Sequence, residues 1–144
     1  MEEFKLMVTG DRYFNDYILL EKCVNILLAD LKKAREIIIV SGLSEGANLL
    51  GEQYAAAHGY EVDEYGDSGQ ITPLLRPELY LKMAWIADAC ICFWDGKCEV
   101  TKQIIEQVNA LPPILIIIKY VAGEEGPVIK DYWQRFDLQI KAAG

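Results

Sequence analysis

The sequence is poor in basic residues and in histidine. It has 14 Lys and Arg residues against 22 Asp and Glu residues, which gives a formal net charge of −8, and it has one histidine. An acidic chain lacks the broad basic face that binding along a nucleic-acid duplex requires. We therefore expect no bulk nucleic acid as a partner. A small anionic ligand is still compatible with this charge, because a few backbone N–H groups and one or two cations can hold a phosphate.

The four cysteines lack the spacing of a metal site or a disulfide framework. No CxxC pair is present, and Cys90 and Cys92 lie two apart in an apolar segment. With a single histidine in the chain, this spacing argues against a zinc site, so we expect no metal. Reduced and mostly buried thiols are typical of cytoplasmic proteins.

Long hydrophobic segments are also missing. Apolar runs such as Ile114–Ile118 are far too short to cross a bilayer. The first residues, MEEFKLMVTG, carry acids and a short apolar run, unlike a secretory signal peptide. We therefore expect a cytoplasmic protein with no membrane partner. The length of 144 residues, 52% of them hydrophobic, predicts a single domain, residues 1–144, with one core.

The sequence alternates between strand-like and helix-like segments. Short apolar runs predict strands, and segments with helical spacing between them predict helices. Asn15 or Asp16 is a candidate N-cap of the first helix. The predicted strands are residues 4–10, 36–40, 60–65, 88–94 and 114–118, and the predicted helices are residues 17–33, 46–58, 76–86, 101–109 and a last amphipathic segment at 128–140.

This alternation predicts the fold class. Strands that alternate with helices form parallel sheets through right-handed crossovers, and near-continuous apolar strands indicate a sheet covered on both faces. We predict an α/β fold with a Rossmann-like, doubly wound, mainly parallel five-stranded sheet in the order 3-2-1-4-5 and helices on both faces. Ligands in such sheets bind at the carboxyl ends of the strands, where the strand order reverses.

Small, polar and charged residues gather in the loops that this topology brings together. Glycine lets the backbone approach a ligand closely, and the first N–H groups of a helix attract phosphate. The loops after the first, second and fourth strands, and the start of the third helix, supply the candidate ligand-binding residues: Gly10, Asp11, Arg12, Gly42, Ser44, Gly46, Asn48, Arg76, Trp94, Gly96, Lys97 and Thr101.

These residue types indicate a site for a phosphate-bearing ligand. An arginine can grip two phosphate oxygens at once. Neither the P-loop pattern nor the GxGxxG fingerprint is present, and we expect no cofactor. The expected roles are donors to phosphate for Gly42, Ser44, Gly46 and Thr101, neutralisation of charge for Arg12 with Lys97 or Arg76, a contact with a sugar hydroxyl or base edge for Asn48, and a wall of the pocket for Trp94.

Each candidate residue also has a purely structural interpretation. The glycines are typical of turns, and Gly46 can serve close packing of a helix on the sheet alone. Trp94 is typical of a core or an interface, although Trp94 or Tyr13 is also suited to stack on a base. Arg12 has three acidic residues as candidate surface partners: Asp11, Asp16 and Glu45.

Three motifs occur in order along the chain. They are Gly10-Asp11-Arg12-Tyr13-Phe14, then Gly42 through Gly46-Ala47-Asn48, then Phe93-Trp94-Asp95-Gly96-Lys97-Cys98-Glu99-Val100-Thr101. Over residues 6–119 the chain resembles the YspA-like branch of the SLOG superfamily, whose motifs are G-[SD]-R-x-F, G-x-x-x-G-A-D and F-W-D-G-x-S-x-G-T. The resemblance implies a Rossmann-like fold and a nucleotide or nucleotide-derived ligand in the pocket that the motifs form.

The chain departs from the family pattern at several positions. Asn48 stands where the family has Asp, and an amide cannot act as a general base. Cys98 replaces a serine and Val100 a glycine. Ile104 stands where the related phosphoribohydrolases have their catalytic glutamate, so the resemblance implies a ligand class without a reaction.

We therefore expect a protein that binds a nucleotide-derived small molecule, as a sensor or a sequestering module. The alternative is a hydrolase that cleaves an N-glycosidic or phosphate bond of such a ligand, with Asp11, Glu45, Asp67 and Asp95 as candidate acids. A third class is an interaction protein that uses its acidic surface and the aromatic segment Asp131–Ile140. We also expect a homodimer or a higher homo-oligomer.

Overall fold

A computed structural model describes residues 2–42, 45–65 and 77–120 of the chain. Its sheet has five strands, all parallel, in the order β3-β2-β1-β4-β5. The predicted fold class and strand order are confirmed. The strands are β1 (Glu2–Gly10), β2 (Arg35–Ser41), β3 (Glu61–Glu64), β4 (Ala89–Trp94) and β5 (Ile114–Lys119).

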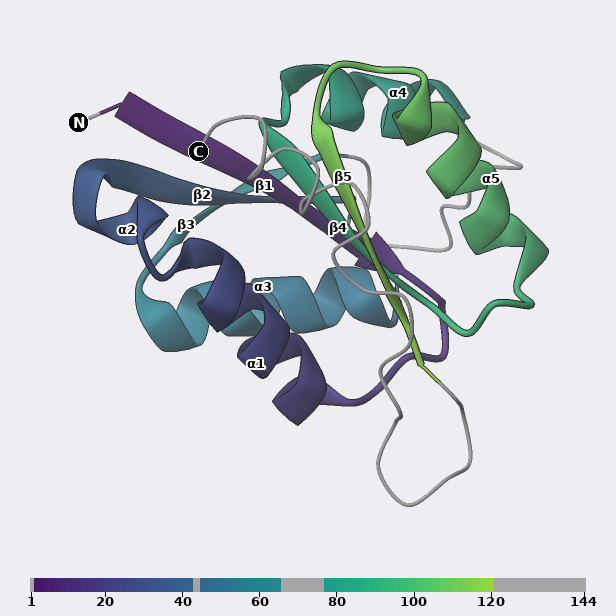
Figure 1. The fold of residues 1–144 in the computed structure, drawn as a ribbon, viewed down its shortest axis with the longest axis horizontal. Coiled ribbons are helices and arrows are strands. Elements are labelled where there is room, and N and C mark those ends of the chain that lie inside the picture. Colours follow the sequence, from purple (N-terminus) through teal and green to yellow (C-terminus); the bar gives the residue numbers. More distant parts are fainter. Residues whose placement is uncertain (1, 43–44, 66–76, 121–144) are drawn as a thin grey trace.

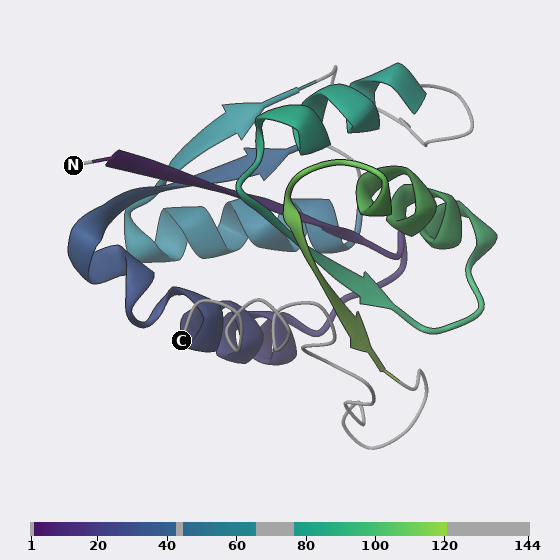
Figure 2. The same ribbon diagram turned by 45° about the horizontal axis from the view of Figure 1, so that its top comes forward.

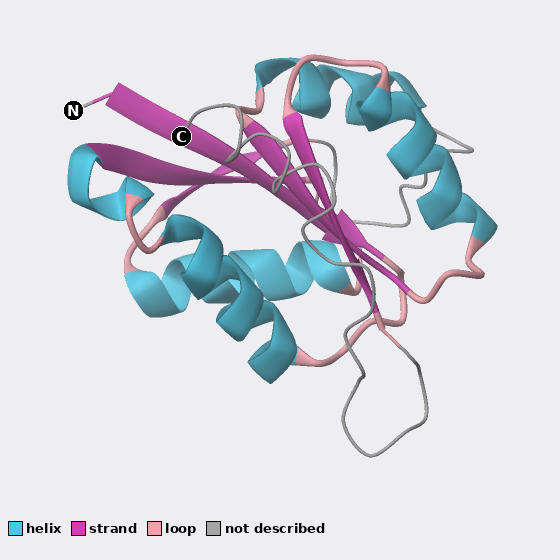
Figure 3. Ribbon diagram, in the orientation of Figure 1, coloured by secondary structure: helices cyan, strands magenta, loops and turns pink. Residues whose placement is uncertain are grey.

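Helices cover both faces of the sheet, as Figures 1 and 2 show from two directions. On one side lie α1 (Tyr17–Leu28) and α3 (Ala47–His58), and on the other lie α4 (Pro77–Ile86) and α5 (Glu99–Asn109). Because helices lie on both faces of the sheet, the strands form the middle layer of three (Figure 3). No helix among the described residues has the length and apolar character needed to cross a bilayer.

Alternate residues of the central strands supply two separate cores. On the α1 and α3 side, buried residues such as Leu6, Ile39 and Ile91 belong to one hydrophobic cluster. On the α4 and α5 side, their neighbours Met7 and Cys90 belong to a second cluster. Side chains that alternate across a strand and are apolar on both faces explain why these strands read as continuous apolar runs.

The prediction of one helix over residues 17–33 is wrong, because this segment forms two helices. Asp16 is the N-cap of α1, and its Oδ1 accepts from the backbone N of Leu19 at 3.0 Å. The helix ends at Leu28, and a separate short helix, α2 (Leu31–Ala34), follows Asp30. Unlike Asp16, Asp30 has helical dihedral angles and its side chain makes no capping hydrogen bond.

Most other boundaries differ from the predicted ones by one or two residues. β1 begins two residues early, and β3 is shorter than predicted. α5 begins two residues before Thr101, and α3 begins one residue after Gly46. Residues 66–76, between β3 and α4, and the amphipathic segment predicted at 128–140, with its aromatic part at 131–140, lie outside the described residues.

Gly51 fixes how closely α3 packs on the sheet. A Cβ placed at Gly51 would lie 2.8 Å from Cβ of Val8 and 2.9 Å from its Cγ1, in the middle of β1. The β-branched valine cannot move away because Val8 is itself fully buried. Glycine thus permits a helix–strand distance that alanine does not.

We predict that Gly51→Ala lowers the free energy of unfolding by about 1–2 kcal/mol. Overpacking in a core typically costs about 1–3 kcal/mol, which exceeds the gain of about 1 kcal/mol from better helix propensity. Urea unfolding followed by circular dichroism measures the change. A more stable Gly51→Ala variant would contradict this account of α3 packing.

Candidate functional site

The loops after β1 and β2 are in contact at the carboxyl edge of the sheet. The backbone N of Ala47, the first residue of α3, donates to the carbonyl O of Asp11 at 3.4 Å. Gly46 has φ +73°, and a Cβ there would lie 2.2 Å from the same carbonyl O. Only glycine combines this positive φ with this close approach, which explains why Gly46 precedes α3.

The carboxylate of Asp11 joins the loop after β1 to the loop after β4 and to the end of β5. Its Oδ1 accepts from the hydroxyl of Thr101 at 2.5 Å. Its Oδ2 accepts from the backbone N of Asp95 and from the hydroxyl of Tyr120, each at 2.7 Å. Asp11 is 4% exposed. This buried acid thus receives three hydrogen bonds from three segments.

Pairing between β1 and β4 places Asp11 at this point. The two strands pair as far as Gly10 with Phe93, and the backbone N of Asp11 then donates to the carbonyl O of Phe93 at 2.8 Å. A Cβ at Gly10 would lie 2.3 Å from that carbonyl O. Glycine at position 10 therefore allows β1 and β4 to stay paired up to Gly10 and Phe93, and Asp11 follows at the carboxyl edge of the sheet.

Burial raises the pKa of Asp11 above its ordinary value, because an ionised carboxylate loses its hydration inside the protein. The hydrogen bonds from Thr101, Tyr120 and the Asp95 backbone lower the pKa in the opposite direction. Burial is the larger of the two effects, so the pKa of Asp11 stays raised.

The loop before α5 supplies its own anion to its backbone amides. Oδ1 of Asp95 accepts from the backbone N of Lys97 and of Cys98, both at 2.8 Å. Gly96, between Asp95 and Lys97, has φ +86°. Thr101 is 1% exposed and its hydroxyl is bonded to Asp11. Thr101, the donor expected to hold a phosphate beside α5, is thus already bonded to a carboxylate of the chain, and so are the backbone N–H groups of Lys97 and Cys98.

Arg12 lies at the surface, and Glu45 is its partner among the three acidic residues considered. Its Nε lies 2.9 Å from Oε2 of Glu45, and both side chains are substantially exposed. The Arg12 guanidinium also lies 5.8 Å from the ring centre of Tyr13, which is 84% exposed. Exposed ion pairs contribute little to stability, so a ligand anion can compete with Glu45 for this guanidinium.

Asn48 lies inside the protein and bridges the ends of two strands. It is 1% exposed. Its Oδ1 accepts from the backbone N of Gly42 at 3.3 Å, and its Nδ2 donates to Oγ1 of Thr9 at 3.2 Å. The expected contact with a sugar hydroxyl or a base edge would require the amide to give up these partners.

Trp94 is partly buried and its indole N–H is engaged. Nε1 donates to the carbonyl O of Cys98 at 3.1 Å, and Nζ of Lys119 lies 5.4 Å from the ring centre. Lys97 is exposed on the same loop. Trp94 therefore holds the loop before α5 through its bond to Cys98, and the side chain of Lys119, at the end of β5, lies over its ring.

The structure thus brings Gly10, Asp11, Arg12, Gly46 and Thr101 together, with Trp94 at the end of β4 and Gly96 and Lys97 on the loop that follows it. Gly42 and Asn48 lie beneath this edge in the interior. Ser44, Arg76 and Asp67 lie outside the described residues. Tyr120 was not identified from the sequence as a site residue. Like Asp11 and Asp95, Tyr120 is the first residue after a strand, and this position could have identified it.

The described cysteines are free thiols, as expected. Burial raises the pKa of Cys23 to about 11 and that of Cys90 to about 12, and it raises the pKa of Cys92 well above the ordinary value. These three thiols are therefore protonated at neutral pH and are poor nucleophiles. Within the described part of the chain, no group of three His, Cys, Asp or Glu residues is suited to hold a metal ion.

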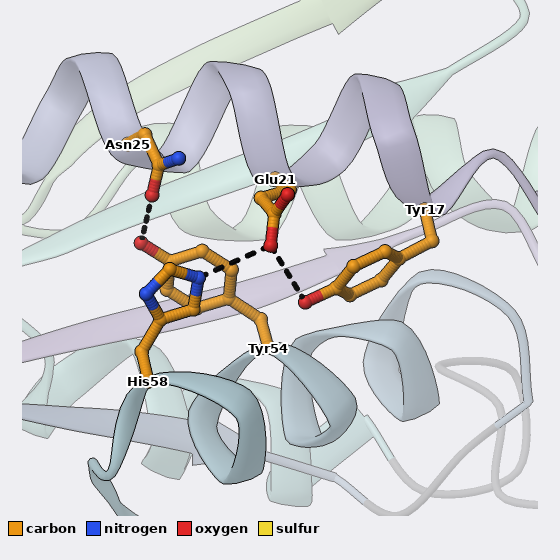
Figure 4. A network of polar contacts seen from close by, with 5 residues as sticks. All are labelled: Tyr17, Glu21, Asn25, Tyr54 and His58. Carbon is orange, nitrogen blue, oxygen red and sulfur yellow. Dashed lines mark hydrogen bonds and ion pairs between the residues drawn. The ribbon is translucent and has the colours of Figure 1, made fainter.

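A second polar cluster joins α1 to α3 away from this edge (Figure 4). Oε2 of Glu21 lies 3.2 Å from Nε2 of His58 and accepts from the hydroxyl of Tyr17 at 3.2 Å. The hydroxyl of Tyr54 donates to Oδ1 of Asn25 at 2.7 Å, and the rings of Tyr54 and His58 stack with centres 4.1 Å apart. His58 thus has a structural role in the last turn of α3.

No family model, curated protein or solved structure matches this chain. The resemblance to the SLOG superfamily therefore stays a prediction from the three sequence motifs. The function has to be argued from the geometry and charge of the carboxyl edge.

We predict that Asp11→Asn changes how stability depends on pH. Because the folded-state pKa of Asp11 is raised, its contribution to stability is fully present below its ordinary value of 3.8 and is lost as pH rises through the raised value. Asparagine mimics the protonated acid: Nδ2 can donate to Thr101 while Oδ1 accepts from Asp95 and Tyr120.

Urea unfolding from about pH 4 upward should therefore show the variant gaining stability relative to the parent, with a difference that grows by at most about 1.4 kcal/mol per pH unit. Asp30→Asn, at an exposed acid in the turn after α1, is the control and should follow the parent. Parallel pH curves for Asp11→Asn and the parent would contradict the assignment.

Proposed function

We propose that this protein binds a nucleotide or a nucleotide-derived small molecule at the carboxyl edge of its sheet, as a sensor or a sequestering module. The observation that carries the proposal is the meeting of Arg12, Gly46 and Thr101 around Asp11. This edge includes the boundary between β1 and β4, where the strand order reverses. Open parallel sheets bind their ligands at that boundary.

The anionic group of the ligand is best accommodated between Arg12 and the start of α3. The guanidinium of Arg12 is exposed and can form two parallel hydrogen bonds with a phosphate. The N-terminus of α3 adds partial positive charge through the first backbone N–H groups of the helix, although that of Ala47 already donates to the carbonyl O of Asp11. Binding there requires displacement of the Glu45 carboxylate.

The side of the edge near α5 suits an uncharged part of the ligand. The backbone N–H groups of Lys97 and Cys98 are bonded to Asp95, and the Thr101 hydroxyl is bonded to Asp11. Two carboxylates repel a second phosphate. Sugar hydroxyls, in contrast, can donate to a partly exposed carboxylate such as that of Asp95.

Tyr13 is better placed than Trp94 to stack on the base. Its ring is 84% exposed and lies beside the Arg12 guanidinium. The Trp94 ring has its N–H bonded to Cys98 and an ammonium group above it. Stacking of a base on an aromatic side chain contributes about 1–3 kcal/mol, enough to give the site a preference for nucleotides over sugar phosphates.

The contacts of the described acids favour binding over hydrolysis. Asp11 is buried and receives three hydrogen bonds, so a substrate cannot reach it. Glu45 is paired with Arg12, and Asp95 accepts from two backbone N–H groups. Of these three acids, Asp11 and Asp95 face one another, but the buried Asp11 cannot act on a substrate as the second acid or base of a pair.

Thermal shift with a panel of nucleotides, nicotinamide dinucleotide and cyclic dinucleotides tests the proposal directly. A rise in melting temperature without product in chromatography of the incubated ligand supports binding without turnover. Turnover that is lost in Asp95→Asn would support the hydrolase instead. Absence of any shift across the panel would contradict the proposal.

We predict that Arg12→Ala weakens binding of adenosine monophosphate by about tenfold or more, because a charge-assisted hydrogen bond to phosphate is lost. Isothermal titration calorimetry measures the affinity. Arg35→Ala is the matched control, since Arg35 is a partly exposed arginine at the start of β2, beside Glu2 at the opposite edge of the sheet. Equal loss in both variants would show a general charge effect in place of a site at Arg12.

We predict that Tyr13→Ala lowers the affinity for adenosine monophosphate by about fivefold to a hundredfold and leaves the affinity for ribose phosphate unchanged. Only the nucleotide carries a base that can stack on the ring. Parallel titrations with both ligands measure the difference, and Trp94→Phe serves as the comparison. An equal loss for both ligands in Tyr13→Ala would refute stacking on Tyr13.

A further inference from the structure

Tyr120 is held rigidly on the inner side of the candidate site. It is 9% exposed, and its ring packs against Phe14 with ring centres 4.9 Å apart. Phe14 in turn stacks on Phe93, the residue opposite Gly10, with centres 4.7 Å apart. The backbone N of Tyr120 donates to the carbonyl O of Trp94 at 3.2 Å. The phenol hydroxyl is therefore fixed by packing on one side and by the sheet on the other.

This fixed hydroxyl shares an oxygen of Asp11 with the loop before α5. Oδ2 of Asp11 accepts from Tyr120 and from the backbone N of Asp95, each at 2.7 Å, while Oδ1 accepts from Thr101. Rotation of the Asp11 carboxylate would break the bond to Tyr120, because the packed ring cannot follow it. The orientation of the carboxylate, and with it the position of the Asp95 backbone, depends on this hydroxyl.

We propose that Tyr120 is a positioning residue of the candidate site, whose hydroxyl orients the Asp11 carboxylate and thereby fixes the turn that carries Arg12 and the loop that leads into α5. The inference deepens the proposed function, on which its consequence for binding rests. The hold of Tyr120 on Asp11 and Asp95 is a separate claim that needs no ligand.

The chemistry of the contact supplies a readout specific to this role. The hydrogen bond from Tyr120 favours the ionised carboxylate and so lowers the pKa of Asp11, against the effect of burial. The other titratable groups that face Asp11 are the carboxylate of Asp95 and the thiol of Cys92. Removal of the Tyr120 hydroxyl leaves both of these in place, so a change in the titration of Asp11 reports the lost bond.

The test compares Tyr120→Phe with Tyr54→Phe. Each variant keeps a buried ring and loses one hydroxyl that donates to a side-chain oxygen at 2.7 Å. Tyr54 lies between α1 and α3, where its partner is Asn25 (Figure 4). The two substitutions therefore remove similar hydrogen bonds, and only Tyr120→Phe affects Asp11.

The first measurement is a pH titration of the backbone amide resonances by NMR, without ligand. In Tyr120→Phe we expect the transition sensed by the Asp95 amide to move to higher pH and the Asp95 and Thr101 resonances to shift. In Tyr54→Phe both should follow the parent. An Asp95 amide that titrates alike in the parent and in both variants would overturn the inference.

The second measurement is calorimetric titration with adenosine monophosphate. We expect Tyr120→Phe to weaken binding by about three- to tenfold, the effect of one misplaced or lost hydrogen bond, and Tyr54→Phe to leave it unchanged. Unchanged affinity in Tyr120→Phe despite altered resonances would refute a role in binding. If the parent binds none of the nucleotides in the panel, the proposed function fails, while the NMR titration still decides whether Tyr120 orients Asp11.

Discussion

The buried carboxylate of Asp11 holds the carboxyl edge of the sheet together. It receives hydrogen bonds from Thr101 of α5, from the backbone of Asp95 after β4 and from Tyr120 after β5. Its own backbone carbonyl reaches the first residue of α3. An acid in this position is costly to ionise inside the protein, and the three donors offset part of that cost. Loops that are far apart in the sequence are thereby fixed relative to one another.

This arrangement constrains what the edge can bind. The Asp95 carboxylate satisfies the backbone N–H groups of the turn before α5, and Asp11 satisfies the Thr101 hydroxyl. The remaining accessible cation of the turn after β1 is Arg12, whose partner Glu45 is itself exposed. The proposed ligand would therefore meet one exchangeable ion pair beside Tyr13, in place of a row of open phosphate donors. This geometry is the ground on which we propose binding of a small molecule over bond cleavage.

Sequence patterns were informative wherever one physical cause dominates. Apolar runs such as that of β4 predicted strands buried on both faces, and the alternation with helices predicted the strand order. Asp16 was a candidate N-cap because a short acidic side chain can reach the N–H groups of a helix start. The break between α1 and α2 was missed because Leu31 continues the apolar spacing across Ala29 and Asp30, which belong to neither helix.

The sequence by itself determined the fold class, the strand order and the loops that carry the candidate site, because these follow from local periodicity and from the handedness of crossovers. It did not decide the state of each side chain. Asn48 is buried and forms hydrogen bonds with Thr9 and Gly42. Arg12 pairs with Glu45, one of three candidate acids, and Tyr120 donates a hydrogen bond to Asp11. Such choices depend on distances between segments up to 109 residues apart, which only the packed tertiary structure sets.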